Sequence, residues 1–357
     1  MKVLIAAGGT GGHIVPAVSL ADILMKEKPE TQIMFFGSSN RMEATVIPEA
    51  GYRFYGTEMS GMNAGISAKL KSAVSLVKAQ RGCTQLLKNF RPDIVVAFGN
   101  YISVPIVNAA RKQHIPVILH EQNSFAGKAN RFLASKADRI VCCYDSNLEQ
   151  MPRDKCLVYG NPAATKAKEA QFDRQEVIDM GLDPDQPFVV FMMGSLGSSS
   201  VSEIIDEACG LFDEGFQIII AAGKDNDYQF KTPSEGRVRI VPFVNGRSML
   251  KGCALAVTRA GATTMAEIGA LGTAAVLIPS PNVANNHQVY NARELADEGG
   301  AVMIEEKDLS ARVLADTVNR LMRDPEERRK LSGNAVKAGK ADAAYRMIDV
   351  MEELCHG

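Results

Sequence analysis

Two glycine-rich turns carry the clearest chemical signal in this chain of 357 residues. Gly8–His13 reads Gly-Gly-Thr-Gly-Gly-His, and residues 194–200 read Gly-Ser-Leu-Gly-Ser-Ser-Ser. Each turn stands between an apolar run and a helical pattern, where glycine permits close approach of a ligand and the helix start offers free N–H groups to an anion. One such turn is often only a tight connection. Because each half of the chain opens with one, we interpret them as phosphate or diphosphate sites.

Neither turn matches a better-known nucleotide motif. The P-loop pattern G-x-x-x-x-G-K-[ST] is absent, and the first turn departs from the G-x-G-x-x-G of dinucleotide dehydrogenases. His13 stands beside the first anion site, where a neutral imidazole can take a proton. By residue type alone, a histidine that caps or packs locally is the commoner case.

Further polar groups follow later apolar runs. In Arg259–Glu267, small residues lead into a helix, and the Glu267 carboxylate can accept two ribose hydroxyls; a glutamate that only complements the helix dipole is the alternative. The amides of residues 285–288 are typical of sugar recognition or of an ordinary polar loop. In the first half, residues 99–101 and 120–124 follow apolar runs, at the edge where open α/β sheets bind ligands.

The chain shows no clear metal signature. His120 and Glu121 are adjacent, but no second pair has suitable spacing. The segments 183–185 and 225–227 match D-x-D, which some sugar transferases use for Mn²⁺, yet each lies in a polar loop typical of turns. We therefore expect no metal site and no obligatory cofactor.

Short apolar runs alternate with helical patterns in both halves, and near-continuous hydrophobicity in such runs is typical of parallel strands buried on both faces. The expected strands are Val3–Ala7, Gln32–Phe36, Ile94–Phe98, Val117–His120, Ile140–Cys143, Phe188–Met193, Gln217–Ala222, Arg239–Pro242, Leu255–Thr258, Ala275–Ile278 and Ala301–Ile304. Helical patterns between them include Ile14–Glu27, Val201–Leu211, Ala266–Leu271 and Leu309–Met322. The sequence therefore predicts an α/β fold with two doubly wound parallel sheets, which meet near the break at Gly160-Asn161-Pro162.

Composition narrows the class of protein. A net charge of −1 argues against a general polyanion binder, and 46% apolar residues allow each half a core. The seven cysteines show no C-x-x-C spacing and are expected to be reduced thiols. We expect no signal peptide, because Lys2 leads directly into an apolar run, and no membrane span, because no run reaches about 18 apolar residues.

One segment has a strong local charge bias. Residues 59–92 contain no Asp or Glu but hold Lys69, Lys71, Lys78, Arg81, Lys88 and Arg91, interleaved with apolar residues. A basic amphipathic segment favours an anionic lipid surface, with a solvated helix paired to acids elsewhere as the alternative. Nucleic acid is disfavoured, because aromatic residues are sparse there.

As a set, the order Gly8–His13, His120–Asn123, Gly160–Pro162, Gly261–Glu267 and Gln288–Asn291 resembles the MurG family over nearly the whole chain. These are the undecaprenyldiphospho-muramoylpentapeptide β-N-acetylglucosaminyltransferases of bacterial cell-wall synthesis. The resemblance implies a GT-B fold with an interdomain cleft: residues 1–161 as the acceptor- and membrane-facing domain, 162–340 as the UDP-sugar domain, and 341–357 as a helix returning to the first. It also implies inverting transfer of GlcNAc from UDP-GlcNAc to the C4 hydroxyl of lipid I, giving lipid II, by a peripheral protein on the cytoplasmic face of the membrane with cell-wall synthesis partners.

The resemblance assigns roles by position. His13 is the candidate base, and the acceptor-side residues are Thr10, Gly11, Gly12, Tyr101 and Asn123. The donor-side residues are Ser195, Val244, Ala262, Thr263, Thr264, Glu267, Gln288 and Asn291. Val244 takes the position that reads uracil through the backbone, Glu267 the ribose carboxylate, and Gln288 and Asn291 the GlcNAc readers.

Three positions depart from the family pattern. Ala163-Ala164 replace a common Val-Arg near the donor, Leu196 replaces a glutamine, and His287 replaces the first of two glutamines. These departures leave other UDP-sugar enzymes open, either a transferase with a different lipid acceptor or a UDP-GlcNAc 2-epimerase. A non-catalytic nucleotide-sugar binding partner is a further alternative.

Overall fold

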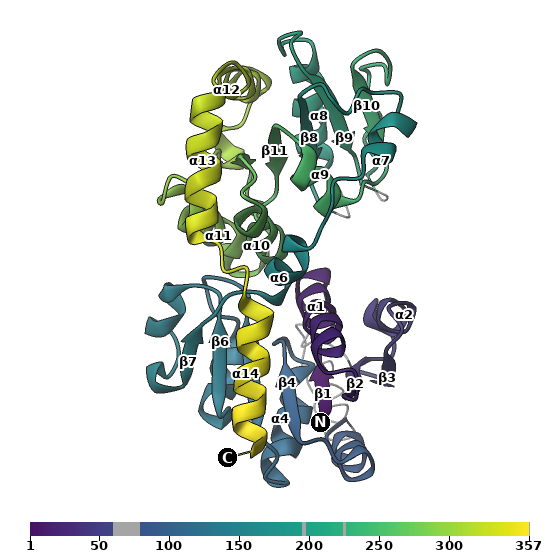
Figure 1. Ribbon diagram of the computed structural model, residues 1–357, viewed down its shortest axis with the longest axis vertical. Coiled ribbons are helices and arrows are strands. Elements are labelled where there is room, and N and C mark those ends of the chain that lie inside the picture. The colour runs from purple at the N-terminus through teal and green to yellow at the C-terminus, as the bar shows by residue number, and fades with distance from the viewer. Residues whose placement is uncertain (60–78, 195–197, 224–225, 357) are drawn as a thin grey trace, which may run out of the picture. The chain divides into compact units, whose positions relative to one another are not determined.

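A computed structural model describes residues 1–59, 79–194, 198–223 and 226–356. The chain divides into two compact units, Met1–Lys166 with Asp342–Gly357, and Ala167–Ala341. Each unit is a parallel sheet with helices on its faces (Figure 1). The predicted α/β class is therefore confirmed.

The first unit holds a seven-stranded sheet in the order β3-β2-β1-β4-β5-β6-β7. Its strands are β1 Lys2–Ala6, β2 Gln32–Ser38, β3 Arg53–Thr57, β4 Ile94–Ala97, β5 Val117–Glu121, β6 Arg139–Cys142 and β7 Cys156–Val158. Its helices are α1 Gly11–Glu27, α2 Glu43–Glu49, residues 79–90, α4 Ser103–Lys112, α5 Lys128–Leu133 and α14 Ala343–His356, with α6 Pro162–Lys168 at the junction of the units. Short 3₁₀ turns span Ala134–Lys136, Asp145–Glu149 and Arg153–Lys155.

The second unit holds a six-stranded sheet in the order β10-β9-β8-β11-β12-β13. Its strands are β8 Phe188–Met192, β9 Gln217–Ala221, β10 Val238–Val241, β11 Leu255–Thr258, β12 Ala275–Leu277 and β13 Val302–Met303. Its helices are α7 Arg174–Asp179, α8 Ser199–Cys209, α9 Gly246–Gly252, α10 Ala262–Leu271, α11 His287–Ala296, α12 Ala311–Arg323 and α13 Pro325–Ala338, with 3₁₀ turns at Ala284–Asn286 and Glu306–Asp308.

Side chains on alternate strand positions build two cores in each unit, one on each face of the sheet. In β1, Leu4 belongs to one core and Val3 and Ile5 to the other, and all three are fully buried. This alternation follows from the two-residue period of a strand. It explains why the strand sequences are apolar throughout rather than alternating.

All eleven predicted runs form strands, but the sequence missed β3 and β7. Both lie at edges of the first sheet, where burial is incomplete. The sequence of β3 is interrupted by Arg53 and Gly56, and β7 spans only three residues, too few to stand out as a strand. Helix α1 also begins earlier than predicted, at Gly11 rather than Ile14, because the glycine turn supplies its first residues.

Helix α14 packs on the first unit. Met347 and Met351 are fully buried in the core that contains α1, and α14 also contacts β4 (Figure 1). At its start, the Ala344 N–H donates to the Thr165 hydroxyl at 2.9 Å. The last segment of the chain thus completes one face of the first sheet.

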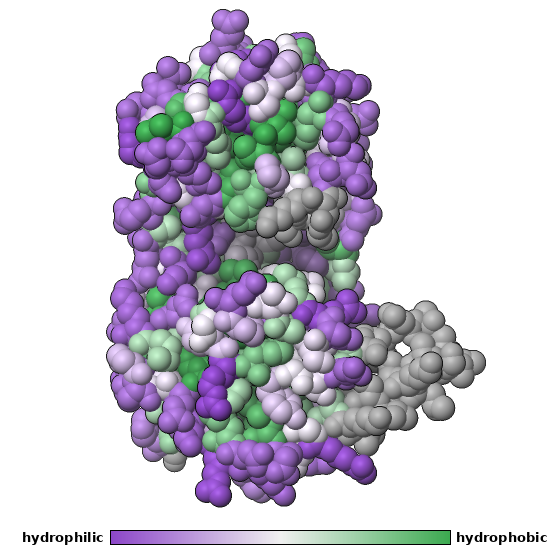
Figure 2. All heavy atoms as spheres, turned by 90° about the vertical axis from the view of Figure 1, so that its right-hand side faces the viewer, coloured by the Kyte–Doolittle hydropathy of each residue, from purple (hydrophilic) through white to green (hydrophobic). Residues whose placement is uncertain are grey.

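The visible surface is mixed in polarity. In Figure 2, hydrophilic residues occupy the margins of each unit and hydrophobic residues gather toward the middle. None of the described helices combines the length and hydropathy needed to cross a bilayer. The described part of the basic stretch includes exposed Arg81 and Lys88, whereas Lys69, Lys71 and Lys78 lie outside the described residues.

Candidate functional site

Each sheet has one point where the strand order reverses. It lies between β1 and β4 in the first unit and between β8 and β11 in the second. Ligands of open α/β sheets bind at the carboxyl ends of strands beside such a point, because the two connecting loops diverge to opposite faces there. The Gly8–His13 turn follows β1 at the first point, and Gly194, the first residue of the second glycine-rich segment, follows β8 at the other.

The Gly8–His13 turn leaves the start of helix α1 uncapped. Thr10 is the N-cap residue in extended conformation, but its hydroxyl lies 2.9 Å from His13 Nδ1 instead of capping a backbone N–H. The first N–H groups of the helix, at Gly11 and Gly12, therefore remain suited to an anion. The same contact sets the His13 ring beside that anion position.

Gly11 has no packing reason to be glycine. Its φ is not positive, and a Cβ built on it would meet no atom within 4 Å among the described residues beyond its chain neighbours and its own helix backbone. Gly9 differs, because its φ is +85° and an added Cβ would collide with the side chain of Asn100. Open space at an uncapped helix start is what close approach of a ligand requires.

Glu43 supports the Gly8–His13 turn through hydrogen bonds to backbone N–H groups. Its side chain is fully buried at the start of α2, and it accepts hydrogen bonds from the Gly9 N–H at 3.0 Å and the Ser38 N–H at 2.9 Å. It thereby joins the loop after β1 to the end of β2. Sequence reasoning missed Glu43, because only its contact with a residue 34 positions away reveals the role.

The loop after β4 contacts the Gly8–His13 turn at the same edge of the sheet. The Asn100 side chain donates to the Gly8 carbonyl at 3.2 Å and accepts from the Tyr101 N–H at 2.6 Å. Asn100 has a φ of +69°, which asparagine tolerates better than most residues. The buried Tyr101 hydroxyl has no hydrogen-bond partner among the described residues. A buried orphan hydroxyl on this edge suits a polar ligand.

His120 lies in β5, one residue before its end, as a buried, neutral imidazole. Its Nε2 lies 3.0 Å from the Gly160 carbonyl, so Nε2 carries the proton and Nδ1 does not. Burial lowers the pKa of His120 to about 4, and the nearby charge of His13 acts in the same direction. His120 thus ties β5 to Gly160, and its imidazole stays uncharged at neutral pH.

Glu121 organises the loop that carries Asn123. Its fully buried carboxylate accepts from the Asn123 N–H at 3.0 Å, the Gly127 N–H at 2.9 Å and the Asn130 amide at 2.8 Å. Burial raises the pKa of Glu121, and these donors oppose that shift. Asn123 itself is half-buried, and its carbonyl accepts from Asn147 at 2.9 Å.

In the second unit, helix α10 also starts without a side-chain cap. Gly261 is its N-cap residue, and Ala262, Thr263 and Thr264 form the first turn. The buried Thr263 hydroxyl has no hydrogen-bond partner among the described residues. This helix start is a second place suited to a phosphate. Ser195 and Leu196, in the loop after β8, lie outside the described residues.

Arg259 connects the loops around that helix start. It donates to the Ile278 carbonyl at 3.1 Å, to Glu306 at 2.7 Å and to the Ser198 hydroxyl at 2.8 Å. Loops after β8, β11, β12 and β13 thus meet at one buried guanidinium. An arginine directly after an apolar strand and before a glycine was the available sequence signal, but it carried no assigned role.

The remaining donor-side residues surround α10. Val244 is buried just before α9, and the Glu267 carboxylate pairs with Arg247 of α9 at 2.7 Å. The Gln288 side chain accepts from the Ser280 N–H at 2.9 Å, and the fully buried Asn291 donates to the Ala260 carbonyl at 3.2 Å. In this structure both amides therefore support the loops beside the α10 start.

The Asp183–Asp185 segment forms a turn. The Asp185 N–H donates to the Asp183 carboxylate at 2.9 Å, and Asp185 pairs with Arg174 at the surface. Asp225 of the second D-x-D segment lies outside the described residues. Within the described ranges, no three His, Cys, Asp or Glu side chains gather as a metal site.

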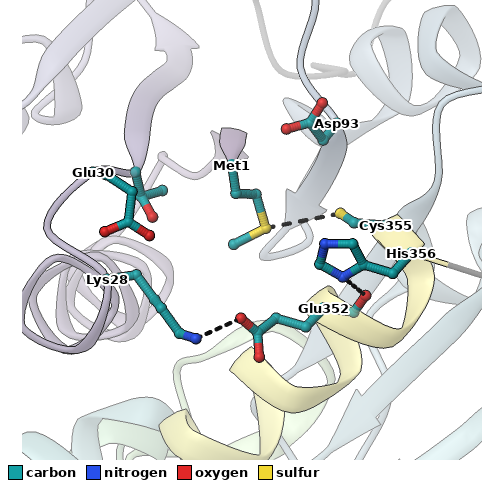
Figure 3. Close-up of a pocket in the computed structure, with 8 residues that line it drawn as sticks. Met1, Lys28, Glu30, Asp93, Glu352, Cys355 and His356 are labelled. Atoms are coloured by element: carbon teal, nitrogen blue, oxygen red, sulfur yellow. Dashed lines mark hydrogen bonds and ion pairs between the residues drawn. The ribbon is translucent and has the colours of Figure 1, made fainter.

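A cavity of about 400 Å³ lies at the opposite edge of the first sheet (Figure 3). Residues preceding β1, β2 and β4 line it together with the end of α14. Lys28 pairs with Glu352 at 2.8 Å, and the Cys355 thiol lies 3.8 Å from the Met1 sulfur. The cavity is separate from the glycine-turn edge, because it opens at the amino ends of the strands.

Comparison with known proteins places this geometry in a family. Residues 3–142 match the Glycosyltransferase family 28 N-terminal domain, and residues 188–347 match the corresponding C-terminal domain. The chain is 36% identical to UDP-N-acetylglucosamine–N-acetylmuramyl-(pentapeptide) pyrophosphoryl-undecaprenol N-acetylglucosamine transferase 1 of Bacillus cereus, over 99% of each chain. It is 34% identical to the transferase of the same name, without the numeral, from Limosilactobacillus fermentum, over 99% of this chain and 98% of that one.

Solved structures agree on the fold. The crystal structure of Acinetobacter baumannii MurG is similar with a TM-score of 0.78 at 24% identity, covering 99% of both chains. A UDP-GlcNAc 2-epimerase from Neisseria meningitidis bound to UDP-GlcNAc is similar with a TM-score of 0.68 at 14% identity, covering 99% of this chain and 100% of that one. Because a transferase and an epimerase share this fold, the choice between the two activities rests on the full-length identity to the named transferases. The chain belongs to the MurG family and is a glycosyltransferase with the GT-B fold.

Proposed function

We propose that this enzyme transfers GlcNAc from UDP-GlcNAc to the C4 hydroxyl of lipid I and so forms lipid II for peptidoglycan. The full-length identity of 36% to transferases named for this donor and acceptor carries the proposal. The two uncapped helix starts at the strand-order reversals support it, because donor and acceptor each contain a diphosphate.

The acceptor belongs to the first unit in this proposal. Its diphosphate takes the N–H groups of Gly11 and Gly12, with Thr10 alongside. Tyr101 offers its hydroxyl, which has no hydrogen-bond partner in the described ranges, and Asn123 adds an amide on the same sheet edge. The donor belongs to the second unit, with its diphosphate at the start of α10, its uracil at Val244 and its ribose at Glu267.

The proposed reaction is a single displacement with inversion at the anomeric carbon. The acceptor C4 hydroxyl attacks from the face opposite UDP, and His13 takes the hydroxyl proton as the new C–O bond forms. The bond between the anomeric carbon and the UDP oxygen breaks, and negative charge collects on the leaving diphosphate. The N–H groups at the α10 start stabilise that charge.

An assay that measures both reaction products tests the function. Purified protein is incubated with UDP-GlcNAc and a short-chain lipid I analogue, and both UDP and the glycosylated lipid are measured. We expect the two products in equal amounts, with neither forming when lipid I is omitted. Conversion of UDP-GlcNAc to its 2-epimer without lipid would instead indicate an epimerase, and donor binding without either reaction would indicate a non-catalytic role.

Attachment to an anionic membrane surface is the other part of the proposal. The basic segment 59–92 supports it, and its described portion exposes Arg81 and Lys88 on one helix. We expect the protein to sediment with anionic vesicles at low salt, and charge reversal at Lys69, Lys71 and Lys78 to reduce that fraction. Equal sedimentation of the wild type and the variant would contradict this role for the segment. Membership of a cell-wall synthesis complex remains part of the same proposal.

A further inference from the structure

One ion pair in the second unit lies directly at the proposed donor site. Arg247, on α9, donates from Nε to Glu267 Oε1 on α10 at 2.7 Å. The Arg247 side chain is 27% exposed and the Glu267 side chain 12%. Sequence reasoning assigned Glu267 to the ribose and gave Arg247 no role, so the pair is an addition from the tertiary structure.

The geometry of the pair leaves half of the carboxylate available. Among the described residues, Arg247 is the one hydrogen-bond partner of Glu267, and it occupies Oε1. An ionised carboxylate has about four acceptor positions, so Oε2 can still accept hydroxyl donors. With Oε1 held by the guanidinium, the orientation of Oε2 is also restricted.

Helix α9 is anchored independently of this pair. The Asn245 side chain caps its start by accepting from the Ser248 N–H at 3.3 Å, and the Asn245 N–H donates to Glu176 at 2.8 Å. Val244, the proposed uracil position, immediately precedes this cap. One short segment therefore carries both the base-reading position and the partner of the ribose-reading carboxylate.

We propose that Arg247 is a positioning residue for the nucleotide, which holds the Glu267 carboxylate oriented for the two ribose hydroxyls of UDP. This inference rests on the proposed function, since it needs UDP at this site. It predicts that Arg247 contributes to discrimination between ribose and 2′-deoxyribose. A residue that only stabilised the fold would change the affinity for both nucleotides equally.

The pH dependence of UDP binding provides a second signature of the positioning role of Arg247. Burial raises the pKa of Glu267, and Arg247 opposes the shift by its charge and its hydrogen bond. Without Arg247, more of Glu267 is protonated as the pH falls, and a protonated carboxyl accepts ribose hydroxyls less well.

The test measures affinity for UDP and for 2′-deoxy-UDP by calorimetry at pH 6 and pH 8. The variants are Arg247→Met, which keeps a long helix-forming side chain, and Arg247→Lys, which keeps the charge. Arg174→Met is the matched control, because Arg174 belongs to an exposed ion pair in the same unit. Circular dichroism and melting temperature confirm that each variant folds.

We expect Arg247→Met to weaken UDP binding about ten-fold and 2′-deoxy-UDP binding less than three-fold, in keeping with loss of a hydrogen bond to a charged group. The loss should be larger at pH 6 than at pH 8, and Arg247→Lys should recover part of it. Arg174→Met should match the wild type. A wild-type ratio of the two affinities in folded Arg247→Met, at both pH values, would overturn the inference while leaving the proposed function intact. Failure of the wild type to bind UDP would remove the proposed function, and the inference with it.

Discussion

Gly11→Ala separates a ligand-binding role of the first glycine turn from a structural one. The φ of Gly11 is not positive, and in the described part of the chain a methyl group there meets no atom within 4 Å apart from its neighbours in the same helix. Alanine is also the better helix former, by up to about 1 kcal/mol in a helix interior. We therefore expect the free energy of unfolding to stay within about 1 kcal/mol of wild type, with any change toward greater stability.

Activity should respond very differently from stability. The added methyl group occupies the space above the uncapped N–H groups of α1, where the acceptor diphosphate is proposed to bind. Each lost hydrogen bond to a charged group costs about 1.5–3 kcal/mol, which corresponds to a fall of about 10- to 150-fold in acceptor kcat/KM. The Kd for UDP should be unchanged, because UDP is assigned to the other unit.

Gly9→Ala is the control for the fold. Its φ of +85° strains alanine by about 1–2 kcal/mol, and the new methyl group collides with Asn100. This variant should lose stability and activity together, whereas Gly11→Ala should lose activity alone. Steady-state kinetics with lipid I and urea unfolding of both variants provide the comparison. An acceptor kcat/KM within two-fold of wild type in Gly11→Ala would refute the proposal that the acceptor diphosphate fills this space.

Four further predictions address the remaining parts of the site. His13→Ala should lower kcat about 10²- to 10⁴-fold with little change in the Kd for UDP, and near-normal turnover would remove His13 from the chemistry. Glu43→Gln keeps only one good acceptor for the Gly9 and Ser38 N–H groups, so urea unfolding should show a loss of about 1–3 kcal/mol; a wild-type midpoint would contradict the bracing role. His120 has a folded pKa of about 4 against an ordinary value of 6.5, so the unfolded state binds the extra proton between these values and stability falls as the pH falls from 6.5 to 4. The loss of unfolding free energy should reach about 3 kcal/mol in the wild type and be smaller in His120→Gln. Identical pH profiles of stability in the two proteins would argue against this role of His120. Dialysis against EDTA should leave most activity, and complete loss would direct attention back to the D-x-D segments.

Much of the candidate site was predictable because local sequence encodes it. The strand, glycine turn and helix succession at Gly8–His13 appears as a pattern of neighbours, and so does the start of α10. Parallel strands bring their carboxyl ends to one edge, so the placement of Tyr101 and Asn123 at the same sheet edge as the first turn follows from the strand predictions. The roles of these residues in binding remain predictions.

The sequence was less informative about what supports those residues. The sequence assigned Asn291 to the sugar but did not reveal that its buried side chain donates to the Ala260 carbonyl, and its role toward the sugar stays a prediction. Glu43, Arg247 and Arg259 received no role from sequence. Each acts through a partner distant in the chain, and residue type alone does not identify such a partner.

The sequence by itself determined the α/β class, the eleven main strands and the glycine-containing turns that lead into helices, because these depend on hydrophobic period and on glycine, which act over a few residues. That the starts of α1 and α10 lack side-chain caps was decided by the tertiary structure. Only the tertiary structure decided which distant group contacts each of the buried charged side chains. Gly9 lies 34 residues from Glu43, Arg247 lies 20 from Glu267, and Arg259 lies 47 from Glu306. These pairs form because the packing of each sheet and its helices brings distant segments together, and burial leaves each charged group few partners other than the one that the fold supplies.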